Sequence, residues 1–384
     1  MSFGWSRDRW EEYLFDRVGQ PLANAVVYQA KGKTIAKVWS EQRERFKRIA
    51  QKNAGVADME IIQAAINYVY NKYGSGVVKL SPQEFLSLNV SQGLILYKGV
   101  SLVGSVSKGY SDVDKPEYGT RIRFWASEAK DIPVLTLESG HGAEVRDIFF
   151  KAHNRYQGIL IKARFAKIVN VSINRTTSYG VKLLGDGSLC AENHLENVGV
   201  YNPDEYIDGF VFQGTDGGYA TQNTLINCHA FVKGGGTDNY GFNFVANGDS
   251  NYLIRCRAGG IGGNLPAGVI FNSGNPTADN GVYGNVIIAL NCENGSNPQV
   301  IVNKTEANAA PNYIIGVKYV ASGESSVRIK IQNNGRAIVV GAYGWLTIPT
   351  TEPLDPVAGC MYFDTSTGEL KIYDGSAWKS VSLS

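Results

Sequence analysis

The sequence lacks the features that define several large classes of protein. No run approaches the ~18 consecutive apolar residues of a membrane-spanning helix, so we expect no membrane insertion. Residues 1–13 carry charges where an export signal needs an apolar core, which favours synthesis in a cytoplasm without Sec export. The net charge of +2 is too small to predict a nucleic-acid partner.

Cysteine and histidine are scarce as well. Five cysteines, an odd number with no CxxC pair, and four histidines are spread over 384 residues. Disulfide frameworks and zinc sites show paired cysteines or histidines at ligand spacing, so we expect no metal and no cofactor. His194 and His229 have no such partners and are expected to be surface residues.

Glycine and tyrosine, in contrast, are abundant, with 44 and 21 residues, which favours turn-rich β structure. The 43% apolar and 19% charged residues are typical of an ordered protein. One basic segment, Arg43–Arg48, has a helix-like composition, and we expect a solvated helix face or a docking surface there.

An inexact repeat between Val145 and Asn294 decides the fold class. One signature is a short strand, which begins at Val145, Ile168, Leu195, Leu225, Leu253 and Ile287. The other is a glycine followed by alternating apolar residues, at Gly158, Gly180, Gly209, Gly241 and Gly268. Short-strand units with a period of 20 to 50 residues predict a solenoid, in which each unit buries its apolar face by stacking on its neighbours.

The columns of the short-strand signature predict where each position points. Its first, fourth and sixth positions are apolar in every copy, so they are expected to face inward, and Cys228 and Cys256 fall in the fourth. The step from first to fourth breaks the two-residue alternation of a strand and indicates a corner. The third position, at that corner, reads Asp147, Asn170, Asn197, Asn227, Arg255 and Ala289. Asparagine tolerates left-handed backbone and can bond the asparagine of the next coil, so a structural ladder is expected rather than a catalytic or glycan-binding row.

In the glycine-led signature, no outward position holds a carboxylate. Several outward residues are apolar, among them Leu160, Leu184, Val211 and Ile270. We expect this face to suit burial against a neighbouring subunit better than catalysis.

Three segments outside the repeat resemble known families. Ala57–Ile66, a glycine turn at Tyr73–Gly76 and strands ending at Val100–Gly104 resemble the opening of pectate-lyase-type β-helices, although Ser81–Phe85 departs from their Pro-x-Gly-x-Tyr pattern. Asp16–Tyr28 with Thr34–Ser40 resembles the small N-terminal module of bacteriophage tail spikes. Pro356–Trp378 resembles the β-hairpin unit frequent at the C-termini of phage tail fibre proteins.

These resemblances imply an all-β protein built on a right-handed, single-stranded parallel β-helix. The expected organisation is an N-terminal virion-attachment module (1–56), the β-helix with a capping helix (57–299), final coils or an intersubunit β region (300–349), and a C-terminal β-hairpin tip (350–384). The helix is expected to cover the open end of the solenoid.

The implied function is that of a phage tail spike or tail fibre protein that adsorbs to a host cell-surface polysaccharide. The resemblance implies a homotrimer, located in the virion tail and synthesised in the host cytoplasm, with other tail or baseplate proteins bound through the N-terminal module. Two alternatives stay open: a polysaccharide depolymerase and a purely structural tail adaptor. Hydrolysis is favoured over lyase chemistry, because no calcium-binding acid cluster with a Lys or Arg base can be assembled from the sequence.

Two groups of acids are candidates for a site. A glycosidase needs two carboxylates ~5–5.5 Å or ~6.5–9.5 Å apart, and coils stacked at ~4.8 Å can supply such spacings. The first group is Asp186, Asp216 and Asp249, with Tyr219 and Tyr252 as sugar-stacking residues. The second is Asp204, Glu205, Asp208 and Asp238, with Tyr201, Tyr206 and Tyr240. Asp beside Gly, Ser or Asn is also ordinary turn chemistry, so a structural role is the alternative for both.

Overall fold

A computed structural model describes residues 23–40, 45–105, 119–272, 281–293, 300–303, 310–320, 327–332, 337–340, 344–347, 352 and 361–381. The chain forms two compact units. Unit 1 is Met1–Lys182 with Cys190–Ile207, and unit 2 is Leu183–Leu189 with Asp208–Ser384. No helix in the described ranges is long and apolar enough to cross a membrane.

Unit 1 begins with three antiparallel strands, β1 (Ala25–Ala30), β2 (Lys33–Ser40) and β3 (Arg45–Asn53). The expectation of a basic helix at Arg43–Arg48 was therefore wrong for its described part, which is strand. The antiparallel ladder with β2 supplies the backbone hydrogen bonds of this segment, and such pairing overrides the weak helix preference of Arg and Lys. Residues 16–22 and 41–44 of the N-terminal module lie outside the described ranges.

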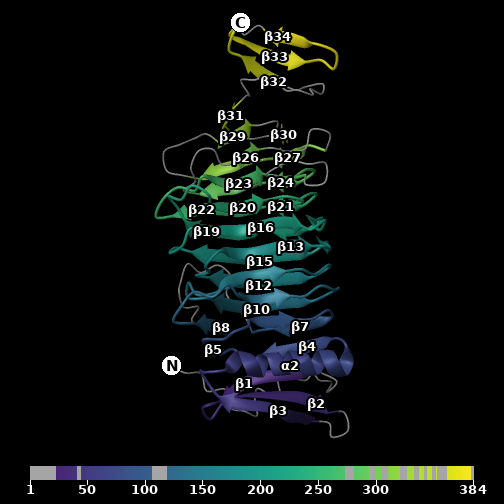
Figure 1. The fold of residues 1–384 in the computed structure, drawn as a ribbon, viewed down its shortest axis with the longest axis vertical. Helices are drawn as coiled ribbons and strands as arrows, with labels where there is room; N and C mark the ends of the chain where they lie inside the picture. Colours follow the sequence, from purple (N-terminus) through teal and green to yellow (C-terminus); the bar gives the residue numbers. More distant parts are fainter. Residues whose placement is uncertain are drawn as a thin grey trace. The chain divides into compact units, whose positions relative to one another are not determined.

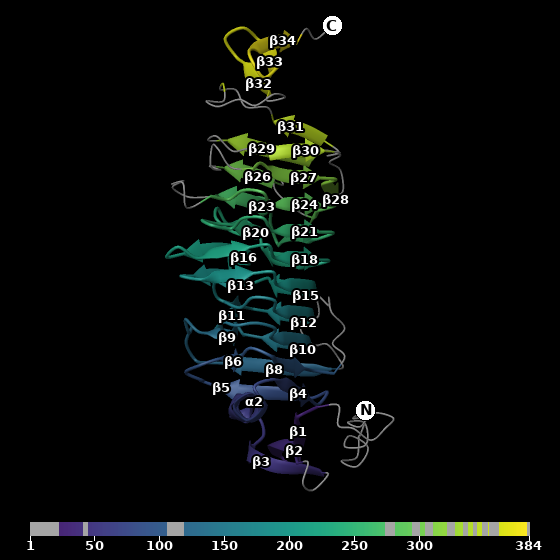
Figure 2. The same ribbon diagram turned by 90° about the vertical axis from the view of Figure 1, so that its right-hand side faces the viewer.

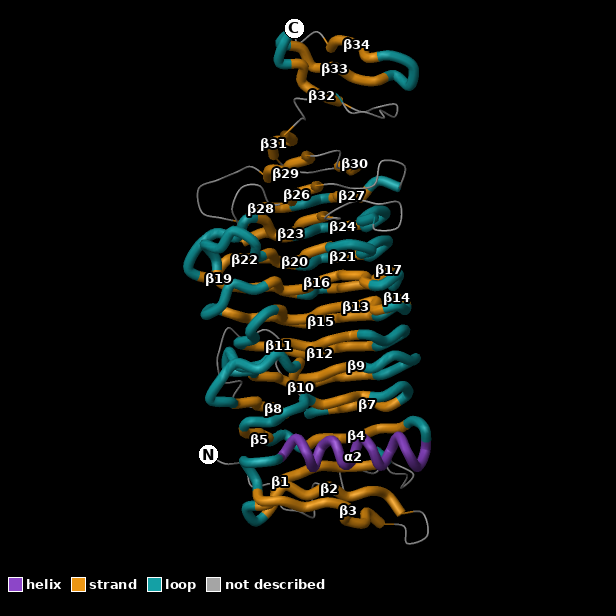
Figure 3. Tube along the Cα trace, viewed as in Figure 1, coloured by secondary structure: helices purple, strands orange, loops and turns teal. Residues whose placement is uncertain are grey.

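Helix α2 (Asp58–Tyr73) lies between this antiparallel module and the first coil, as Figure 3 shows in purple. Its buried residues include Ile62, Ile66 and Val69, and its last turn ends at Gly74, whose positive φ of 72° suits glycine. Through these residues the helix packs against the first coil. The strand edge is covered differently, because β1 pairs in parallel with β4 (Gly76–Leu80).

Parallel strands in register form the coils of each unit, which makes the fold a parallel β-helix (Figures 1 and 2). In unit 1 one sheet contains β5 (Glu84–Leu88), β7 (Val100–Val103), β8 (Thr120–Trp125), β10 (Glu144–Lys151), β12 (Lys167–Asn174) and β15 (His194–Asn202). A second sheet contains β6 (Leu94–Leu96), β9 (Pro133–Leu137) and β11 (Gln157–Ile161). Strand β13 (Tyr179–Asp186) follows.

In unit 2 one sheet contains β16 (Asp208–Thr215), β20 (Tyr240–Phe244), β23 (Ala267–Asn272), β26 (Val300–Asn303), β29 (Val327–Gln332) and β31 (Gly344–Thr347). A second stack of strands contains β18 (Thr224–Ile226), β21 (Tyr252–Ile254), β24 (Val286–Ile288), β27 (Asn312–Ile315) and β30 (Ala337–Val340). The strands that follow the corner form a third stack, β19 (His229–Lys233), β22 (Arg257–Ile261), β25 (Asn291–Glu293) and β28 (Lys318–Val320). The described strands of 300–349 thus continue the coils.

The corner predicted from the repeat is present. All six residues of the third column have φ between 51° and 59°, the left-handed region. In unit 1, Asn197 Nδ2 donates to Asn170 Oδ1 at 3.1 Å, and Asn170 Nδ2 donates to Asp147 Oδ1 at 3.0 Å. The inward columns are buried in both units, Cys228 and Cys256 among them, and neither of these cysteines forms a disulfide.

A second asparagine ladder, which sequence reasoning missed, lies inside unit 2. Its members, Asn223, Asn251, Asn285 and Asn312, are all fully buried. The Oδ1 atoms of Asn251, Asn285 and Asn312 each accept from the backbone N–H and the Nδ2 of the preceding member, for example from Asn251 N to Asn285 Oδ1 at 2.9 Å. Their Nδ2 groups also bond backbone carbonyls, so the ladder satisfies the polar backbone of a buried turn.

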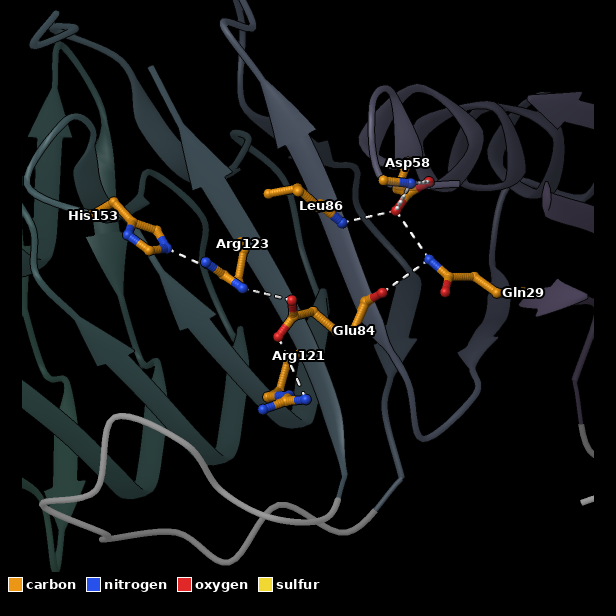
Figure 4. A network of polar contacts seen from close by, with 8 residues as sticks. Gln29, Asp58, Glu84, Leu86, Arg121, Arg123 and His153 are labelled. Atoms are coloured by element: carbon orange, nitrogen blue, oxygen red, sulfur yellow. Dashed lines mark hydrogen bonds and ion pairs between the residues drawn. The ribbon is translucent and has the colours of Figure 1, made fainter. Parts of the chain in front are cut away.

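Asp58 fixes the start of α2 to its surroundings. Its carboxylate is fully buried and accepts from Gln29 Nε2 at 3.0 Å, Thr34 Oγ1 at 2.5 Å and Leu86 N at 2.7 Å (Figure 4). In the same view Glu84 pairs with Arg121 and Arg123, and Arg123 Nε contacts His153 Nε2 at 3.1 Å. These bonds join the antiparallel module, the helix and the first coil.

The C-terminal hairpin prediction is also met. Strands β32 (Met361–Asp364), β33 (Glu369–Tyr373) and β34 (Trp378–Val381) form an antiparallel sheet. Both connections are closed by an Asp: Asp364 Oδ1 accepts from Ser366 N at 2.9 Å, and Asp374 Oδ1 accepts from Ser376 N at 2.8 Å.

Candidate functional site

The first acidic group lies on three turns that stack in unit 2. Gly187 N donates to Thr215 O at 3.1 Å, which joins the turn of Asp186 to that of Asp216. Thr215 Oγ1 also donates to Asp186 Oδ1 at 3.1 Å. Asn247 Nδ2 donates to Gly218 O at 3.0 Å and brings in the turn that precedes Asp249.

Glycine makes the close stacking of these turns possible. A Cβ on Gly218 would lie 2.4 Å from Gly185 O, a distance that real Cβ atoms essentially never show. Asp186 and Asp216 are exposed on the resulting edge, and the side chain of Tyr219 is partly buried beside them. We call Asp186, Asp216 and Tyr219 the turn edge.

Asp249 differs from the other two acids of this group because it is buried, with 8% of its surface exposed. Burial raises the pKa of its carboxyl, although hydrogen bonds from Thr221 and Ser250 oppose that shift. Ser250 Oγ lies 3.3 Å from Oδ2, while Oδ1 has no hydrogen-bond partner among the described residues. A buried carboxyl of this kind favours the protonated, proton-donating form more than an exposed one does.

Tyr252, predicted to stack on sugars beside Asp249, lies on a different surface. Its strand places it in register with Val286, Tyr313 and Ile338 on the outward side of β21, β24, β27 and β30. The neighbouring outward column is wholly aliphatic. Together these columns form the apolar face: Tyr252, Ile254, Val286, Ile288, Tyr313, Ile315, Ile338 and Val340.

The side chains of the apolar face are more exposed than is usual for large apolar residues. Tyr252, Tyr313 and Ile338 expose 41%, 36% and 44% of their surface, and Val340 exposes 53%. On the glycine-led sheet, where a subunit contact was expected, Val211 and Ile270 are already buried within the chain. Val211 and Ile270 are therefore less accessible to a partner than Tyr252, Ile338 and Val340 of the apolar face.

The second acidic group is divided between the two units. In unit 1, Asp204 forms an ion pair with Arg175 and accepts from Asn154 Nδ2 at 3.1 Å, so its carboxylate has structural partners. Glu205 and Tyr206 are exposed on the same turn, and Tyr201 is partly buried.

In unit 2, Asp208 is the first residue of β16. Its Oδ1 accepts from Tyr240 N and its Oδ2 from Asn243 Nδ2, both at 2.8 Å. Asp238 is exposed, and burial, together with Asp238 and Asp208, raises the pKa of Tyr240. Asp208 therefore anchors one strand to the next, and Asp238 is the freer carboxylate of the two.

Sequence reasoning also missed a group on the outward side of β19, β22 and β25. It contains Phe231, Arg257 and Glu293, which lie within strands and outside any acidic motif. The signal that could have found them is their alternation with the inward residues Ala230, Ala258 and Cys292. His229, expected to be a surface residue, is partly buried there, and burial and the adjacent Arg257 lower its pKa to about 4.

No family model matches the chain, and no curated protein matches it. The structure is similar to several solved ones. ORF18 of Geobacillus virus E2 is 13% identical, with a TM-score of 0.49, over 91% of this chain and 93% of that one. A tailspike protein mutant of E. coli bacteriophage HK620, solved in complex with a pentasaccharide, is 10% identical, with a TM-score of 0.47, over 78% and 61%. A mannuronan C-5 epimerase A-module from Azotobacter vinelandii is 15% identical, with a TM-score of 0.44, over 77% and 95%.

Proposed function

We propose that this chain is a phage tail spike that adsorbs to a polysaccharide on the host cell surface. The sequence motifs at both ends support its place in a virion tail, with other tail or baseplate proteins bound through the N-terminal module. The observation that carries the proposal is the turn edge of unit 2. Two successive turns there present the exposed Asp186 and Asp216, with Tyr219 on the second turn, so a polysaccharide that lies along the coils can meet a carboxylate on each of these turns.

The contacts follow from ordinary sugar chemistry. Exposed carboxylates accept hydrogen bonds from hydroxyl groups, and a tyrosine ring offers an apolar surface to the C–H side of a sugar. Glu205 with Tyr206, and Asp238 with Tyr240, supply further contacts of the same kind. Asp204 and Asp208 are not among the proposed sugar contacts, because their carboxylates bind groups of the protein itself.

Binding of the labelled full chain to host cells tests the proposal. We expect binding that disappears when surface polysaccharide is removed and that weakens in Asp216→Asn and Tyr219→Ala. Glu128→Gln, at an exposed acid of unit 1, is the matched control and should bind as the parent does. Binding that survives removal of the polysaccharide would overturn adsorption as the function.

One observation favours a second function, hydrolysis of that polysaccharide. Asp249 combines burial, an unpartnered carboxyl oxygen and a raised pKa, the properties of a general acid. An exposed Asp of the adjacent turns would then be the second carboxylate. Release of reducing ends from host polysaccharide, abolished in Asp249→Asn while binding persists, would establish this activity; no release by the parent chain would exclude it for that substrate.

We also propose that the spike is a homotrimer and that the apolar face is the subunit contact. An exposed apolar surface of this kind on four neighbouring strands is typical of an interface. In this arrangement the two outward columns of β21, β24, β27 and β30 are covered by a partner copy.

A further inference from the structure

The outward side of β19, β22 and β25 carries a compact group around one glycine. The strand register sets Phe231 beside Gly259 and Gly259 beside Glu293, with Arg257 two residues before Gly259 on the middle strand. We call Phe231, Arg257, Gly259 and Glu293 the sheet platform. The residues that alternate with them, Ala230, Ala258 and Cys292, are buried in the core, so the platform faces away from it.

Gly259 determines how the phenyl ring lies. A Cβ at this position would be 2.9 Å from Phe231 Cε1 and 2.8 Å from Glu293 O, closer than any side chain tolerates. The ring of Phe231 therefore rests against bare backbone, and it is held between the strands instead of projecting freely. His229, 6.1 Å away between ring centroids and at 79°, contacts it edge-on.

Arg257 and Glu293 form a donor and acceptor pair at this ring, and the Arg257 guanidinium lies over one of the ring's faces. Arg257 Nη2 forms an ion pair with Glu293 Oε1, and its Cζ lies 5.8 Å from the centre of the Phe231 ring. The Arg257 side chain is 38% exposed and that of Glu293 21%, so both are accessible from solvent.

We propose that the sheet platform binds a neutral pyranose through two adjacent hydroxyl groups, an inference that rests on the proposed role in polysaccharide binding. The C–H side of the sugar packs on Phe231. Each hydroxyl can both donate and accept, so neighbouring hydroxyls accept from the guanidinium and donate to the carboxylate. The charges of Arg257 and Glu293 cancel, and a uronate would bring a second negative charge to Glu293. The platform therefore selects neutral sugars over acidic ones.

Saturation-transfer NMR on the full chain tests this selection. The probes are D-glucose and D-galactose against D-glucuronate and D-galacturonate at equal concentration. We expect saturation of the ring protons of at least one neutral sugar and none of its uronate. Phe231→Leu and Arg257→Gln should bind that sugar about ten-fold more weakly. Arg255→Gln, at an exposed arginine of the adjacent corner, is the matched control and should leave the signal unchanged.

The result distinguishes the platform from the turn edge. Stronger saturation of uronates, no saturation of any sugar, or full signal in Phe231→Leu would overturn the platform while leaving polysaccharide adsorption intact. Loss of polysaccharide binding in Asp216→Asn with an unchanged sugar signal would leave the platform intact. Thermal melts of every variant confirm that it is folded.

Discussion

Asn197 donates from its Nδ2 to Oδ1 of Asn170 across a distance of 3.1 Å, and both residues have φ near 54°. The corner of the coil thus makes two demands at one position, a left-handed backbone and an amide that bonds along the stack. Asparagine meets both, whereas glycine meets only the first and alanine neither.

Substitutions of Asn170 separate these two demands. Asn170→Gly should lower the free energy of unfolding by about 1 kcal/mol, because glycine loses the side-chain hydrogen bonds but adopts the positive φ without strain. Asn170→Ala should cost roughly 1–2 kcal/mol more, because alanine disfavours positive φ. Denaturant unfolding followed by circular dichroism measures both. Equal stability of the alanine variant and the parent would show that the corner does not depend on asparagine.

The buried ladder should be more sensitive than the corner. Asn251→Ala leaves the backbone N–H of Asn223 and the carbonyl of Ala220 without their partners inside the core. An unsatisfied buried group costs about 1–3 kcal/mol, so we expect a loss of roughly 3 kcal/mol or more, measured by the same unfolding curves. Asn264→Ala, at an exposed position, is the control and should change little. A loss no larger than that of the control would mean that the ladder is incidental.

The sequence repeat determines which parts of the structure could be predicted. The apolar columns and the corner asparagines recur in register, so the fold and the buried positions were predictable. The buried ladder had a signal too, an Asn two residues before each apolar strand start at Leu225, Leu253 and Ile287, but it lies outside the six positions of the short-strand signature. The helix-like composition of Arg43–Arg48 gave a wrong expectation for its described part, because the pairing of this segment with β2 is set by tertiary contacts.

The candidate site was less predictable, since function there depends on which side of a strand a residue faces. Tyr252 is close to Asp249 in the chain but lies in the apolar face. Asp249 looks like Asp216 in sequence, and only the fold shows that it is buried. Phe231 and Glu293 are 62 residues apart in the numbering, and each pairs in register with Gly259. No local sequence motif predicts this arrangement.

The C-terminal sheet should weaken in acid. Hydrogen bonds from Ser366, above all its hydroxyl, lower the pKa of Asp364 to about 2, and those from Ser376 and Ala377 lower that of Asp374. An unfolded Asp titrates at about 3.9, so these bonds contribute fully above that pH and their contribution is lost as the pH falls toward 2. Hydrogen exchange of residues 361–381, corrected for intrinsic rates, should show this loss. Asp364→Asn should reduce the pH dependence, and an unchanged profile would contradict the assignment.

The apolar face should control assembly. Ile338→Lys places a charge among exposed aliphatic residues and should shift the trimer toward monomer in sedimentation velocity at micromolar concentration. Phe165→Lys, at another exposed apolar residue but in unit 1, is the control and should leave the trimer intact. A stable monomer in the parent chain would remove the trimer proposal, and a trimer in Ile338→Lys would move the contact elsewhere.

Calorimetric titration of the full chain with purified surface polysaccharide of the host is the most direct test of adsorption at the turn edge. We expect saturable binding by the parent chain and affinity at least about ten-fold lower for the double variant Asp216→Asn with Tyr219→Ala, the change produced by a loss of ~1.4 kcal/mol. Absence of binding by the folded parent chain, or equal affinity of the double variant, would contradict it.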